Sequence, residues 1–124
     1  MAKKLVSFLG DVIEVDEASV DAVTAVSGSG PAYFFYLIES MIETAIELGL
    51  SRKAAKRLVI KTALGSAKLL LAVKEGPAEL MAKVASKGGT TEAALHIFES
   101  RDFKGIVKEA VKRAHGRSKE LSRS

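Results

Sequence analysis

One short segment, residues 86–91, combines residue types suited to holding a small anion. Gly88 and Gly89 let the backbone approach a ligand closely. A helix is expected to begin at Thr91, so its free N–H groups and the positive end of its dipole face the segment. The hydroxyls of Ser86, Thr90 and Thr91 add donors. The pattern favours a site for a carboxylate or phosphate, and a plain Gly-Gly turn with a threonine N-cap is the alternative.

A second glycine-rich segment, residues 27–30, precedes Pro31. Gly28 and Gly30 begin like a dinucleotide-binding fingerprint, but Tyr33 stands at the third glycine position and no βαβ unit surrounds it. The residues alone predict a flexible loop that lets Pro31 start a helix.

The sequence gives little support for a metal site or for nucleophilic catalysis. His96 and His115 are expected on different helices without metal-ligand spacing, so we expect no metal site. No local signature of a Ser-His-Asp set is present. The absence of cysteine from the 124 residues excludes disulfides and cysteine nucleophiles and fits a reducing compartment. The apolar run at the N-terminus is too short for a signal peptide, so a cytoplasmic location is expected.

The central element that must position these segments is a helix expected over residues 31–48 and ended by Gly49. Apolar residues cover nearly its whole circumference, which predicts burial in a core or between copies of the chain. Its three acidic residues argue against a membrane span. They form a stripe, and the next helix carries a basic stripe of the same spacing. Direct pairing of the stripes and two solvated faces both remain open. The acidic stripe is Glu39, Glu43 and Glu47, and the basic stripe is Lys53, Arg57 and Lys61.

The remaining pattern predicts an all-α fold of about six helices in one helical domain, residues 17–124. Besides the central helix, helices are expected over residues 17–26, 52–74, 77–85 and 91–100, and a last one follows Asp102 as N-cap. Residues 1–16 are expected to be a connector, with a short helical turn at 3–9 and an extended piece at 12–15. A strand at 12–15 would find no partner elsewhere in the sequence.

The last helix is basic, with Lys104, Lys108 and Lys112 spaced like the solvated side of an amphipathic helix. No aromatic residues are interleaved with these lysines. Although the net charge is +4, we therefore expect no nucleic-acid partner.

Two stretches resemble a known family. Residues 21–33, from Asp21 to Tyr33, resemble the start of the C-terminal domain of pyrroline-5-carboxylate reductase. Residues 88–95 resemble that family's signature region, and the spacing between the stretches and the ending at 111–121 also match. The resemblance extends from about Leu5 to the end, and the two motifs occur in the family's order.

The resemblance implies a fold and an activity. The family reduces 1-pyrroline-5-carboxylate to L-proline with NADH or NADPH, the last step of proline synthesis. Its members join an N-terminal Rossmann domain to a helical domain that forms an interlocked dimer, with the central helix in the interface. By resemblance, Thr91 lies nearest the ring nitrogen, as hydrogen-bond donor or proton relay. The substrate carboxylate is held by Ser86, Gly88, Gly89, Thr90 and Thr91, and the segment near the nicotinamide is Gly28, Ser29, Gly30 and Pro31.

Two departures from the family are visible. Lys87 stands where the family usually has proline, which adds a positive charge beside the carboxylate site. The Rossmann domain is absent from the sequence, whether removed or naturally lacking, so this chain alone is expected to bind no cofactor and to transfer no hydride. The expected partners are a second copy of the chain and a small carboxylate, with no membrane. The alternative function is a non-catalytic helical oligomerisation module.

Overall fold

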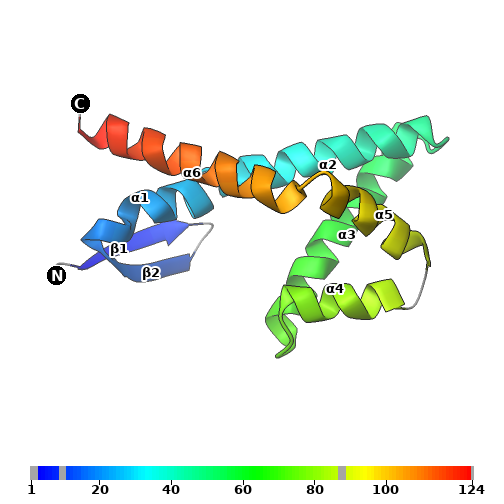
Figure 1. The fold of residues 1–124 in the computed structure, drawn as a ribbon, viewed down its shortest axis with the longest axis horizontal. Coiled ribbons are helices and arrows are strands. Elements are labelled where there is room, and N and C mark those ends of the chain that lie inside the picture. The colour runs from blue at the N-terminus through cyan, green and yellow to red at the C-terminus, as the bar shows by residue number, and fades with distance from the viewer. Residues whose placement is uncertain (1–2, 9–10, 87–88, 124) are drawn as a thin grey trace. The chain divides into compact units, whose positions relative to one another are not determined.

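The computed structural model describes residues 3–8, 11–86 and 89–123 (Figure 1). The chain divides into two compact units, one made of Met1–Phe34 with Asp102–Ser124 and the other of Phe35–Arg101. Helices α2 (Gly30–Glu47), α3 (Arg52–Ala72), α4 (Pro77–Ser86), α5 (Gly89–Ser100) and α6 (Phe103–Ser122) contain most of the described residues, as the sequence predicts.

The first unit opens with a β-hairpin. Strand β1 (Lys3–Phe8) pairs antiparallel with β2 (Asp11–Asp16), with Lys3 opposite Asp16 and Phe8 opposite Asp11. The helical turn expected at residues 3–9 is therefore wrong, and the extended piece at 12–15 does have a partner. An extended backbone leaves its N–H and C=O groups unpaired, and the adjoining segment satisfies them.

Residues 17–28 do not form the single helix expected over 17–26. A 3₁₀ turn, η1 (Glu17–Ser19), leads into α1 (Val20–Val23), and a π-helical turn, η2 (Thr24–Gly28), follows. The wide turn is visible in its hydrogen bonding, because the Ser29 N–H donates to the Thr24 carbonyl, five residues back, at 2.9 Å. π-Helical turns are rare and occur frequently at functional sites.

Helix α6 packs against α1 and η2 in the same unit. The Ser118 hydroxyl donates to the Asp21 carboxylate at 2.7 Å, joining residues 97 positions apart. As expected, Asp102 caps the helix: its side chain accepts from the Gly105 N–H at 3.2 Å. Asp102 adopts the left-handed conformation with φ 53°, which aspartate tolerates better than most residues.

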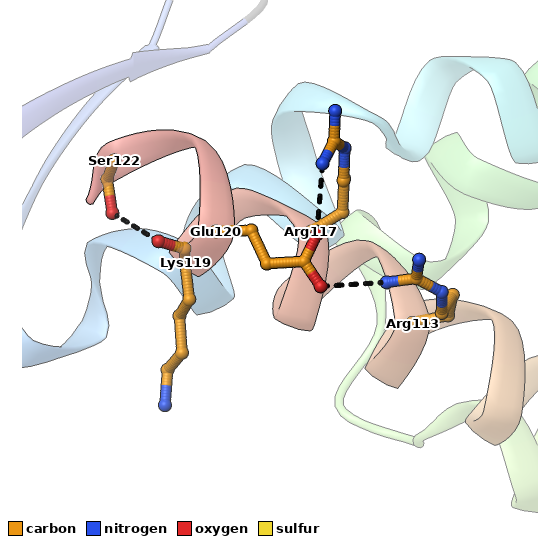
Figure 2. A network of polar contacts seen from close by, with 5 residues as sticks. All are labelled: Arg113, Arg117, Lys119, Glu120 and Ser122. Carbon is orange, nitrogen blue, oxygen red and sulfur yellow. Dashed lines mark hydrogen bonds and ion pairs between the residues drawn. The ribbon is translucent and has the colours of Figure 1, made fainter. Parts of the chain in front are cut away.

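A surface ion network lies in the last turns of α6 (Figure 2). Glu120 lies 3.0 Å from Arg117 and 3.7 Å from Arg113. The hydrogen bond from Arg117 holds the pKa of the Glu120 carboxyl below its usual range, and the Arg113 charge lowers it further. The basic character of this helix is thus partly neutralised at its C-terminal end.

The second unit is a set of helices with well-defined ends. Helix α3 begins after Ser51, whose hydroxyl accepts from the Ala54 N–H at 3.1 Å. The end of α2 is set by Gly49, which has φ 108°, and by a hydrogen bond from the Leu50 N–H to the Ala45 carbonyl at 3.1 Å. A left-handed glycine closing a helix in this way is the stop signal expected there.

The core of the single chain is small. Only Ala25, Ile42, Ala55 and Val59 are buried hydrophobic residues among those described. The last three form one cluster, against which Ile38, Ala45 and Ile46 pack. Helix α2 is apolar over nearly its whole circumference, yet several of its large side chains remain exposed: Phe35 is 67% and Tyr36 80% exposed.

Within the described residues, no helix has the length and hydrophobicity needed to cross a bilayer.

Candidate functional site

The proposed anion-binding segment lies at the junction of α4 and α5. Ser86 is the last residue of α4, and Gly89, Thr90 and Thr91 form the first turn of α5. Lys87 and Gly88 lie outside the described residues. The helix begins two residues earlier than expected, so the N–H groups without intrahelical acceptors are those of the Gly-Thr-Thr sequence itself. These amides and the positive end of the helix dipole attract a negative charge.

The hydroxyls of this segment differ in whether they already donate a hydrogen bond within the chain. The Ser86 hydroxyl donates to the Lys83 carbonyl at 3.0 Å, so its proton is directed back into α4. Thr91 is half-buried and Thr90 is exposed. Neither threonine side chain hydrogen-bonds to another residue in the described part of the chain. Thr91 thus combines partial shielding with an available hydroxyl, the properties required of a hydrogen-bond donor to a ligand.

A hollow of about 900 Å³ lies between α4 and α5. It brings Ser86 and Gly89 together in one lining, together with Met81, Glu92 and His96. Thr90 and Thr91 are not part of that lining. The Glu92 carboxylate lies in the first turn of α5 and also lines the hollow, so it disfavours a second negative charge inside the hollow.

The second candidate segment, residues 28–31, lies in the first unit. Gly28 ends η2, Ser29 is the single residue between η2 and α2, and Gly30 and Pro31 begin α2. The flexible loop expected at residues 27–30 is therefore wrong. The wide helical turn runs almost directly into α2, and neither Gly28 nor Gly30 has positive φ.

A tyrosine whose role no sequence pattern predicts stabilises this segment. The Tyr33 hydroxyl donates to the Ala25 carbonyl at 2.7 Å. Ala25 is only 1% exposed, and a carbonyl in such surroundings needs a partner. In a regular α-helix the Ser29 N–H would donate to Ala25, but here it donates to Thr24. Tyr33 replaces that missing donor, and no sequence signal indicates this because the contact depends on the π-helical turn.

Metal ligands do not cluster in the described residues: no group of three or more His, Cys, Asp or Glu side chains is placed to hold an ion. His96 lies on α5 and His115 on α6, in different units.

Helical elements with a small core and a wide apolar surface define a domain suited to association with another protein surface. The family of the chain follows from comparison with known proteins. It belongs to the pyrroline-5-carboxylate reductase dimerisation family, whose model matches residues 17–121.

Individual relatives agree with this membership. The chain is 48% identical over 122 residues to pyrroline-5-carboxylate reductase of Pseudomonas aeruginosa and 43% identical to that of Synechocystis sp.. These alignments cover 98% of the chain but only 45% and 46% of the relatives. The chain thus spans less than half the length of the curated relatives that it matches.

Solved structures show the same fold. Pyrroline carboxylate reductase of Plasmodium falciparum, solved with NADP bound, has a TM-score of 0.82 and 36% identity over 86% of this chain and 41% of its own. The enzyme of Streptococcus pyogenes has a TM-score of 0.86 and 29% identity over 90% of this chain and 43% of its own. The helical fold inferred from the family resemblance is confirmed.

Proposed function

We propose that the chain is the dimerisation and substrate-binding part of a pyrroline-5-carboxylate reductase, which reduces 1-pyrroline-5-carboxylate to L-proline with NADPH or NADH. Family membership over residues 17–121 supports the assignment. The observation that carries it is that α5 begins at Gly89, with Gly89 and Thr90 exposed, at the position where the resemblance places the substrate carboxylate. The partner in dimerisation is a second copy of the chain, which the large apolar surface supports.

In this proposal the substrate carboxylate binds to the N–H groups at the start of α5. Gly88, Gly89 and Thr90 bring the backbone close to the carboxylate, and the helix dipole favours its charge. Ser86 would join this site by turning its hydroxyl proton from the Lys83 carbonyl to the carboxylate. The Thr91 hydroxyl donates to, or relays a proton toward, the ring nitrogen, which gains a proton when the C=N bond is reduced.

The cofactor supplies the hydride in the complete reductase. Gly28, Ser29, Gly30 and Pro31 would lie near the nicotinamide, and their small side chains permit close approach of a flat ring. A relative from Plasmodium falciparum was solved with NADP bound, which supports a nicotinamide cofactor for the family. Because the described residues contain no βαβ unit to hold a pyrophosphate, we expect no hydride transfer by this chain alone. A cytoplasmic location remains our expectation, which the lack of cysteine fits.

Amide hydrogen exchange with L-proline as ligand tests the substrate site. We expect protection of the amides of Gly89, Thr90 and Thr91, and weaker protection in a Thr91→Val variant, which keeps the side-chain shape and removes the hydroxyl. Pyrrolidine, the same ring without the carboxylate, is the matched control ligand and should protect none of them. Equal exchange with and without L-proline would favour the alternative, a non-catalytic helical oligomerisation module.

A further inference from the structure

Two stripes of opposite charge lie in the second unit, on α2 and α3. Glu39, Glu43 and Glu47 are spaced four residues apart on α2, and all three are exposed. The basic stripe on α3 has the same spacing and is also exposed, at Lys53, Arg57 and Lys61. In the part of the chain that the structure describes, no ion pair involves any of these six side chains. Of the two readings that the sequence left open, pairing within the chain is therefore excluded among these residues.

The neighbours of the stripes distinguish a solvated face from an interface. Beside the acidic stripe, one turn before Glu39, Phe35 is 67% and Tyr36 80% exposed. Beside the basic stripe, Ile60 is 41% and Leu64 46% exposed. Charged residues that flank exposed apolar residues along a helix are typical of helix–helix interfaces, where the charges select the partner. Exposed apolar side chains grouped beside the charges favour an interface over a face that meets water alone.

We propose that the acidic stripe on α2 of one copy pairs with the basic stripe on α3 of a second copy. The inference rests on the proposed self-association and names the residues that direct it. On both helices the charges recur every four residues, about 6 Å apart along the axis. Because the spacing is equal, each charge of one stripe can lie opposite a charge of the other. In a two-fold symmetric dimer the pairing occurs twice, because each copy offers both stripes.

The central residues of the stripes give a test that does not depend on helix direction. Whether α2 and α3 run parallel or antiparallel across the interface, Glu43 faces Arg57 of the other copy. Glu43→Arg therefore places like charges opposite each other at two equivalent positions in a homodimer, and Arg57→Glu does the same with negative charges. A mixture of the two variants restores opposite charges at both positions.

The experiment refolds differently tagged copies together and measures the mixed fraction by tandem affinity capture. Chains that pair without preference give about half mixed dimers by counting alone. For Glu43→Arg with Arg57→Glu we expect nearly all dimers to be mixed, and each variant alone to dimerise at least about tenfold more weakly than the unchanged chain. The matched control is Glu109→Arg with Lys56→Glu, which makes the same charge changes outside the stripes. In this control about half of the dimers should be mixed.

Any of three results would overturn the pairing. A mixed fraction of about half for the stripe variants, with the unchanged chain dimeric, rejects it and leaves the proposed self-association intact. If the unchanged chain is monomeric, both the pairing and the proposed self-association are rejected. If circular dichroism shows that Glu43→Arg or Arg57→Glu does not fold, the neutral variants Glu43→Gln and Arg57→Gln are measured instead. Those variants should weaken dimerisation and reduce its dependence on salt, and unchanged dimerisation in both would reject the pairing.

Discussion

At the scale of single residues, one phenol hydroxyl stabilises the turn that leads into α2. The Ser29 N–H donates to the Thr24 carbonyl and not to the Ala25 carbonyl, which accepts from the Tyr33 hydroxyl instead. The segment proposed to face the nicotinamide, residues 28–31, begins in that turn. Its backbone geometry thus depends on a side chain that has no direct part in the proposed chemistry.

Tyr33→Phe removes only the hydroxyl and leaves the Ala25 carbonyl without this donor. We expect the free energy of unfolding to fall by about 1–3 kcal/mol, the cost of a buried polar group that loses its partner. Urea unfolding measures this loss, and amide exchange should show faster opening at Ser29. Tyr36→Phe is the matched control, because Tyr36 is 80% exposed and its hydroxyl has no hydrogen bond among the described residues. Equal stability of the two variants would contradict this role of Tyr33.

The sequence predicted residue-scale features that depend on nearby residues. Ser51 and Asp102 are N-caps as expected, and Gly49 ends α2, because capping needs only the residue and the helix beside it. The contact between Tyr33 and Ala25 was not predictable, since it exists only when the backbone forms a π-helical turn. The contact of Ser118 with Asp21 joins residues too far apart for any local pattern to indicate.

At the scale of elements, α6 contains two glycines in different surroundings. A Cβ atom added at Gly105 would collide with the carboxylate of Asp102, which caps the helix. A Cβ atom at Gly116 would meet only the end of the Arg113 side chain, at 4.0 Å. Glycine in the interior of a helix lowers its stability relative to alanine, so the same substitution has opposite consequences at the two positions.

Gly116→Ala is therefore expected to raise the free energy of unfolding by about 0.5–1 kcal/mol. Gly105→Ala gains the same propensity but displaces the Asp102 cap, which is worth about 1 kcal/mol, so its net effect is near zero or negative. Thermal unfolding of both variants, with Asp102→Ala as reference, measures the difference. If Gly105→Ala stabilised the chain as much as Gly116→Ala, the Asp102 side chain would not be a significant cap.

The elements that the sequence failed to predict share a physical cause. Residues 3–8 lack a strong alternating pattern, and their pairing with residues 11–16 depends on two segments meeting, which neither shows alone. Residues 17–28 break into three kinds of helical turn, and two of these, α1 and η2, pack against α6, a segment distant in the sequence that no local pattern indicates. The long helices α2 and α3 were predicted well, because many apolar positions and two clear ends define each of them.

At the scale of the whole molecule, the apolar residues of α2 and α3 remain largely uncovered in a single chain. Leu48 is 82% and Leu71 89% exposed, and the described residues bury only four hydrophobic side chains. The sequence predicted burial of α2 on all sides but did not distinguish a core from an interface. A domain with such a small core gains too little from burial to offset the loss of chain entropy on folding. Folding of this chain should therefore depend on association.

Coupled folding and association predicts that thermal stability varies with protein concentration. For a dimer of two 124-residue chains, tenfold dilution should lower Tm by about 3 °C, given an unfolding enthalpy of about 0.7 kcal/mol per residue. Circular dichroism measures Tm over a hundredfold range of concentration, and light scattering gives the mass of the folded species. A dimer whose Tm falls on dilution means that the exposed face of α2 is covered by the second copy. A folded monomer with a constant Tm would mean that the chain stabilises its small core alone, and the proposed dimer would then be rejected.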